Sequence, residues 1–226
     1  LAETRLYGVE TNRLYLQQIL GFTPFTAGEP WTRCLEQLRY RADTVEVLSA
    51  GTQTSVQDYP GRLGYWAVGV PPSGPMDDRA LRLGNRLLGK AEGDGALEIT
   101  LSGPTLKFNT AVQAVVCGAP LAVTLDGAGQ DMNCVFTIPA GATLRLGAIN
   151  GPGVRSYLCL RGGIQVPDYL GSKSTFTLGQ FGGHGGRALR GGDVLHLAPR
   201  AAARVGDQLP AALRTALAQV RTLRVI

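Results

Sequence analysis

The sequence lacks long apolar runs, low-complexity stretches, and clusters of cysteine or histidine. Its 226 residues include four cysteines and two histidines, and no pair of them has the spacing of a zinc or redox site. Its longest apolar stretches are far shorter than the roughly 20 residues that a membrane-spanning helix needs. We therefore expect no bound metal, no membrane partner and a cytoplasmic location with free thiols. Cys117 and Cys159 lie in apolar strand patterns and are predicted to be buried.

Charged residues are also scarce, at 17% of the chain, with a net charge of +5. A basic protein can bind nucleic acid, but here the basic residues are scattered and no aromatic stripe accompanies them. Arg79, Arg82 and Arg86 recur at helical spacing, which is typical of the solvated face of a helix. The sequence therefore predicts no nucleic-acid partner.

Glycine and proline are abundant, with 31 and 13 residues. Short apolar stretches alternate with turn signals such as SGP, DGAG and PAG, which is typical of a turn-rich β protein. Strands are predicted at 45–48, 97–100, 104–108, 112–117, 121–125, 134–138, 143–147, 154–161 and 193–197. Many short strands with one embedded helix indicate a barrel or a sandwich rather than a doubly wound sheet.

The embedded helix is predicted near residues 76–88. Pro75 is suited to its first position, and Asp77 and Asp78 lie where the helix dipole favours negative charge. Gly89 is a suitable C-terminal stop. A further helix is predicted at 210–220 and the start of a strand at 222–226.

The first 38 residues are predicted to form a helical appendage packed outside the β-rich part. Thr11 is a plausible N-cap, and the apolar residues that follow form one face of a helix. Pro30 starts a second short helical pattern, so a helical hairpin is the simplest interpretation of this region.

Residues 51–77, GTQTSVQDYPGRLGYWAVGVPPSGPMD, combine five glycines and four prolines with polar side chains. A rigid loop that presents polar groups to a small molecule would use this composition. The candidate site residues are Gln57, Asp58, Arg62, Ser73 and Asp77. A simpler alternative is a set of tight turns, with Arg62 paired to Asp58 and Asp77 in the first turn of the helix.

This segment, together with residues 96–108, 118–127, 157–175 and 185–195, resembles the allophanate-hydrolase-subunit-2-like domain. That domain is the first half of the carboxyltransferase region of urea carboxylase. The resemblance covers most of residues 45–226 and implies a cyclophilin-like β-barrel. It also implies that the chain is part of a longer polypeptide, because the family's domain continues into a second β half.

The N-terminal pattern ETRLYGVETNRLYL resembles the end of a biotin carboxylase domain. The implied organisation is a biotin carboxylase tail at 1–40, followed by a truncated N-terminal part of a carboxyltransferase domain at 45–226. This order matches urea carboxylase, in which an upstream domain uses ATP, Mg²⁺ and bicarbonate to carboxylate biotin. A biotinyl carrier domain then brings the carboxyl group to the carboxyltransferase domain.

The resemblance implies that CO2 is transferred to a urea nitrogen to give allophanate. Urea is a poor nucleophile, so its site must orient it, polarise its carbonyl and accept a proton. Asp58 and Arg62 are the candidate catalytic residues, and Gln57, Ser73 and Asp77 are candidates for substrate binding. None of the lysines lies in the Met-Lys-Met context of biotin attachment, so biotin is expected on another domain.

Related domains leave alternatives open. Guanidine carboxylases share the domain order, so the substrate can be urea or another small amide or amidine. A 5-oxoprolinase component shares the β domain without the biotin carboxylase, and a non-catalytic regulatory module is also an alternative. The N-terminal tail favours the carboxylase, and the chain on its own is expected to be inactive.

Overall fold

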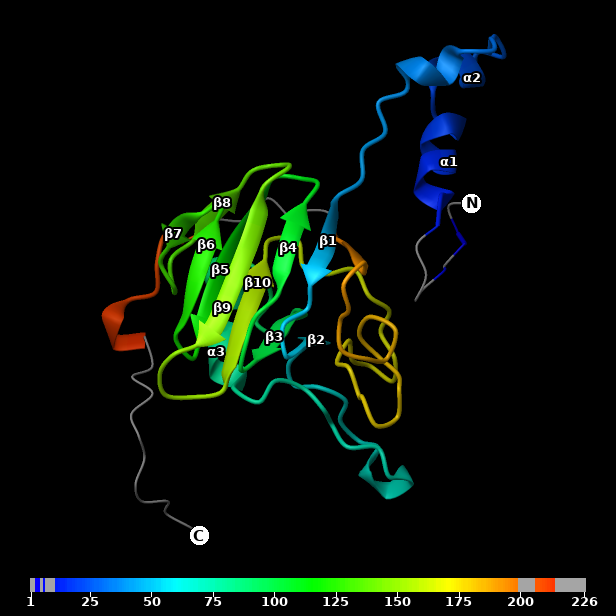
Figure 1. Ribbon diagram of the computed structural model, residues 1–226. Helices are drawn as coiled ribbons and strands as arrows, with labels where there is room; N and C mark the ends of the chain where they lie inside the picture. The colour runs from blue at the N-terminus through cyan, green and yellow to red at the C-terminus, as the bar shows by residue number, and fades with distance from the viewer. Residues whose placement is uncertain (1–2, 5, 7–10, 199–205, 214–226) are drawn as a thin grey trace, which may run out of the picture.

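The computed structural model describes residues 3, 4, 6, 11–198 and 206–213. The described chain is mainly β, as predicted, and forms two antiparallel sheets (Figure 1). The first sheet has the order β11 (Val194–His196), β1 (Thr44–Ser49), β4 (Thr105–Phe108), β9 (Thr143–Ile149), β6 (Leu121–Leu125) and β7 (Ala128–Gln130). The second has the order β2 (Gln53–Gln57), β3 (Ala96–Thr100), β10 (Arg155–Leu160), β5 (Val112–Gly118) and β8 (Phe136–Ile138).

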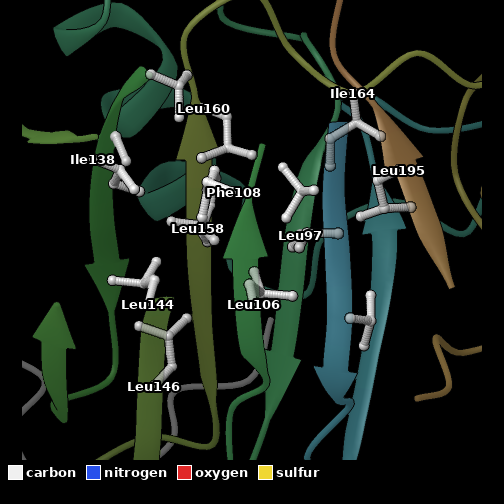
Figure 2. Packing of buried hydrophobic residues seen from close by; sticks show 14 of the residues in the cluster. Leu97, Leu106, Phe108, Ile138, Leu144, Leu146, Leu158, Leu160, Ile164 and Leu195 are labelled. Carbon is white, nitrogen blue, oxygen red and sulfur yellow. The ribbon is translucent and has the colours of Figure 1, made fainter. Parts of the chain in front are cut away.

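The main hydrophobic core lies between the two sheets (Figure 2). Leu106 and Leu144 extend into it from the first sheet, and Leu97 and Leu158 from the second, all fully buried. Alternate residues of each strand point to opposite faces, so every second side chain of these strands enters this core. Burial of this apolar surface is what holds the sheets together.

The second sheet is covered on its other face by α3 (Asp78–Leu87). Val115, Cys117, Tyr157 and Cys159 of β5 and β10 pack there against Leu81 of the helix. Both faces of these strands are therefore buried, which explains their continuous apolar runs. Cys117 and Cys159 are buried free thiols, as predicted.

All pairings of the named strands lie within one sheet or the other. Two facing sheets with a shared core are consistent with a sandwich or a flattened barrel. The cyclophilin-like barrel stays a prediction, because these pairings do not join the two sheets into a closed cylinder.

Strand β2 differs from the sequence prediction, which placed residues 53–57 in a loop. Its polar residues are explained by its position at the end of the sheet, where only β3 pairs with it as a strand. The free edge is covered by loops instead: the amide of Thr175 donates to the Val56 carbonyl, and that of Leu189 donates to the Thr54 carbonyl. Strand β7 was also missed, because its short AGQ sequence has little apolar character.

The N-terminal region contains α1 (Arg13–Leu20), α2 (Thr23–Thr26) and the 3-10 helix η1 (Cys34–Gln37). The helical appendage is thus present, but α1 and α2 stand apart from the sheets and have no buried residue (Figure 1). Gln18 of α1 holds the linker through two hydrogen bonds with the backbone of Arg41. The expected packing of these two helices on the β region is therefore wrong.

Two further 3-10 helices are η2 (Trp66–Val68) and η3 (Ala211–Leu213). η3 is the only described part of the helix predicted at 210–220, and the strand predicted at 222–226 lies outside the described residues. No helix in the described ranges is long and apolar enough to cross a membrane.

Candidate functional site

Asp58 follows β2 directly and binds the loop of residues 169–175. Its carboxylate accepts hydrogen bonds from the hydroxyls of Ser172 and Ser174, and from the backbone amide of Lys173 at 2.8 Å. The amide of Asp58 in turn donates to the Ser174 hydroxyl at 3.0 Å. These four hydrogen bonds tie Asp58 to the loop.

Arg62 binds the same loop through its carbonyl groups. Its Nε donates to the Tyr169 carbonyl at 2.9 Å, and its Nη2 donates to those of Ser172 and Ser174 at 3.4 and 2.9 Å. The guanidinium lies 4.9 Å from the ring centroid of Phe181, a favourable cation–π distance. The side chain is fully buried, and this desolvation lowers the pKa of Arg62.

The two residues therefore act as a clamp, which we define as Asp58 and Arg62 around residues 169–175. The simpler alternative from the sequence was a salt bridge between them, and no such ion pair is present among the described residues. Asp58 instead satisfies donors of the loop while Arg62 satisfies its acceptors. Their roles in catalysis stay a prediction.

Residues 57–62 contact residues 72–74. The amide of Gly74 donates to Oε1 of Gln57 at 3.1 Å, and the amide of Arg62 donates to the Pro72 carbonyl at 2.6 Å. Gln57 is buried and its Nε2 donates to Ser55 and to the Thr175 carbonyl. Its amide is thus occupied within the fold. Ser73 lies between these contacts, half-buried and with a positive φ of 56°.

Asp77 is separate from the clamp and caps α3. Its Oδ1 accepts a hydrogen bond from the amide of Ala80 at 3.0 Å, so it is the N-cap residue rather than part of the first turn. It lines a hollow of about 20 Å³ with Cys117 and Leu209. That volume holds no more than a single water molecule.

A larger cavity, of about 270 Å³, lies beside the clamp. We call it the polar cavity. It is lined by Asp94, Gly95, residues 162–168, Lys173 and Ala198. Lys173 belongs to the clamped loop, and its backbone amide is the one bound by Asp58. The clamp therefore fixes the backbone of a residue whose side chain lines the polar cavity.

A buried cation lies behind the cavity wall. The side chain of Lys90 is only 5% exposed, and its ammonium donates to Oδ1 of Asn85 at 3.0 Å and lies 3.9 Å from Oδ2 of Asp94. Burial lowers the pKa of Lys90. A Cβ on Gly163, which has a φ of 78°, would lie 3.5 Å from this ammonium, so the wall approaches it closely.

The sequence analysis missed Asp94, Asp168 and Lys173 as site residues. Asp94 and Lys173 lie far apart in the sequence and in ordinary loops, and only the fold brings them to one cavity. In residues 184–193, a glycine-rich segment, the charged side chains bind one another. Arg187 forms a bidentate ion pair with Asp193 at 2.8 Å, and His184 lies 3.6 Å from the same carboxylate. The described part of the chain contains no group of three or more His, Cys, Asp or Glu side chains that could hold a metal ion.

The fold therefore presents a small polar cavity with side chains of both charges, next to the clamp. The comparison with known families is more specific. The chain belongs to the family described as "Carboxyltransferase domain, subdomain A and B", whose model matches residues 68–226.

Several relatives agree with this assignment. The urea amidolyase of Saccharomyces cerevisiae is 44% identical over 197 residues, which is 87% of this chain and 11% of that protein. A 5-oxoprolinase subunit of Escherichia coli is 39% identical over 156 residues, 67% of this chain and 48% of that protein. The crystal structure of Kluyveromyces lactis urea carboxylase matches with a TM-score of 0.87 and 42% identity, covering 96% of this chain and 20% of that one. This chain thus spans about a tenth of the length of its urea amidolyase relatives.

Proposed function

We propose that this chain is part of the carboxyltransferase domain of a biotin-dependent urea carboxylase. The domain would transfer a carboxyl group from carboxybiotin to a nitrogen of urea and so form allophanate. The observation that carries the proposal is the 44% identity to urea amidolyase over 197 residues. The match to the 5-oxoprolinase component, the second candidate, is 39% over 156 residues and leaves more of this chain unmatched.

The reaction needs groups that hold urea and its developing charge. Carboxylates accept hydrogen bonds from urea N–H groups, and an ammonium donates to a carbonyl oxygen. Asp58 and Arg62 serve this chemistry indirectly in our proposal, because the clamp keeps the loop of residues 169–175 in one conformation. Preorganised polar groups contribute more to catalysis than mobile ones.

In this proposal biotin is attached to another domain and only enters the site on this chain. None of Lys90, Lys107 and Lys173 lies in the sequence context of biotin attachment. The Lys173 ammonium has no hydrogen-bond or ion-pair partner among the described residues, and it suits a carbonyl or carboxylate oxygen. When carboxylated, biotin supplies an activated carboxyl group. The proposed partners are a biotinyl carrier domain and the rest of the same polypeptide.

The finer organisation is part of the same proposal. Residues 1–40 would be the tail of an upstream biotin carboxylase domain that binds ATP and Mg²⁺. Residues 45–226 would be the first part of a cyclophilin-like carboxyltransferase domain. The location would be cytoplasmic.

A test uses the full-length protein that contains this chain. ATP hydrolysis with bicarbonate is measured alone and with urea, guanidine or 5-oxoproline. Urea should stimulate it most, and the isolated 226-residue chain should show no urea-dependent hydrolysis. Stimulation by guanidine alone would assign the enzyme to that substrate. A response to 5-oxoproline without any response to urea would favour the 5-oxoprolinase-like alternative.

A further inference from the structure

The polar cavity combines charges of both signs at one place. Asp94 and Asp168 line it as carboxylates, and Lys173 lines it as a cation. Lys90 lies behind the wall, 3.9 Å from the carboxylate of Asp94. Lys90 partly offsets the charge of Asp94 from behind the wall, so no large excess of either sign remains at the cavity.

Hydrogen-bonding capacity at the cavity is also unused. Neither the Lys173 ammonium nor the Asp168 carboxylate has a hydrogen-bond or ion-pair partner in the described ranges, and Asp94 has only the distant contact to Lys90. The cavity thus offers carboxylate acceptors together with an ammonium donor. A molecule with several N–H groups and one carbonyl oxygen has the complementary set.

The cavity volume limits the ligand's size. Sites for drug-sized molecules measure roughly 300–1,000 Å³, and this cavity measures about 270 Å³. A molecule of a few heavy atoms fits in this volume.

We propose that the polar cavity binds the carboxyl acceptor as a small neutral amide, with Lys173 donating to its carbonyl oxygen. Asp94 and Asp168 accept hydrogen bonds from its N–H groups. This assignment rests on the proposed function and adds the location of the acceptor site and the residues that hold the acceptor. A guanidinium ion is disfavoured, because it has no acceptor oxygen for Lys173 and carries the same charge.

Chemical footprinting tests the location. The full-length protein is acetylated with acetic anhydride, with and without urea or acetamide at non-denaturing concentrations, and modification is quantified by peptide mass spectrometry. At a ligand concentration about ten times its Kd, acetylation of Lys173 should slow about tenfold. Lys107 is an exposed residue of β4 and serves as the internal control, with an unchanged rate. Guanidinium at the same concentration should protect neither residue.

Three outcomes would overturn the inference. One is that urea and acetamide leave Lys173 unprotected at concentrations that saturate urea-dependent turnover. Another is equal protection by guanidinium, and the third is equal protection of Lys107. Protection of Lys173 without any urea-dependent turnover would contradict the proposed function and leave the neutral-amide site standing. The two failures are therefore distinguishable.

Matched variants provide a second measurement. Lys173→Met should raise the KM for urea roughly ten- to hundredfold, as expected for losing a hydrogen bond from a charged donor. Lys107→Met removes the same group from an exposed strand and should leave the KM unchanged. An unchanged KM in a folded Lys173→Met enzyme would contradict the assignment.

Discussion

The hydroxyl of Tyr157 donates a hydrogen bond of 2.7 Å to Oε2 of Glu98 on the neighbouring strand. The same hydroxyl accepts one from the backbone amide of Asp77 at 2.8 Å, and Glu98 accepts another from that of Met76. Tyr157 is fully buried and Glu98 is nearly so. This pair therefore fixes the start of α3 to the second sheet.

Removing the Tyr157 hydroxyl should destabilise the fold. Tyr157→Phe leaves the amide of Asp77 unpaired and removes one donor from Glu98, at an expected cost of about 1–3 kcal/mol. Chemical denaturation measures the change in free energy of unfolding. Tyr59→Phe is the control, because Tyr59 is 37% exposed and its ring contacts Arg82. A Tyr157→Phe protein as stable as the Tyr59→Phe protein would contradict the role of this hydroxyl.

The same tyrosine predicts a loss of stability at alkaline pH. Burial, with a further contribution from Glu98, raises the pKa of Tyr157 in the folded protein above its usual value of about 10. The contribution of the raised Tyr157 pKa to the free energy of unfolding is fully present below about pH 10. It is lost as the pH rises further, because the unfolded chain releases the tyrosine proton first.

Comparison of unfolding free energies between about pH 9 and pH 11 checks this point, since effects of other groups cancel between wild type and Tyr157→Phe. Above about pH 10 the wild type should lose up to about 1.4 kcal/mol more per pH unit than the variant. Parallel pH profiles would show that the hydroxyl does not remain protonated in the folded state.

Replacing Gly84, inside α3, by alanine should lower stability, whereas the same change in most helices raises it. Alanine normally stabilises an exposed helix interior relative to glycine by about 1 kcal/mol. Here a Cβ would lie 2.7 Å from Sγ of Cys159 and 3.4 Å from Sγ of Cys117. We expect Gly84→Ala to destabilise by about 1–3 kcal/mol through overpacking. Gly129→Ala in β7 meets nothing within 4 Å and should be close to neutral; a stabilised Gly84→Ala protein would refute the tight contact.

The clamp predicts local protection of the loop of residues 169–175. Asp58→Ala removes the acceptor for the Lys173 amide, so deuterium exchange of peptides covering this loop should accelerate. Asp126→Ala is the matched control, because Asp126 accepts from the Thr143 amide at 2.8 Å on the other sheet. It should accelerate exchange near Thr143 only. Unchanged exchange in the loop of the Asp58→Ala protein would show that the clamp does not hold it.

The chain's alternating and apolar patterns were sufficient to predict most strands. The runs around Cys117 and Cys159 indicated buried strands, and Pro75, Asp77 and Gly89 located the single helix between the strands to within two residues. These features depend on local backbone preferences and on the spacing of apolar residues, and short stretches of sequence determine both. Residues 53–57 were missed because they are mostly polar, and because their free edge is covered by loops from residues 175 and 189, far away in the sequence.

The candidate site was predicted only in part. Glycines, prolines and polar residues marked residues 51–77 as a candidate site, and within it Gln57 and Arg62 contact residues 72–74. The roles of Asp58 and Arg62 as a clamp depend on residues more than 100 positions away in the sequence. The polar cavity likewise depends on Asp94 and Lys173, which approach each other only when β2, β3 and β10 form one sheet. Local sequence determines strands and turns, whereas long-range strand order decides which charged groups share a cavity.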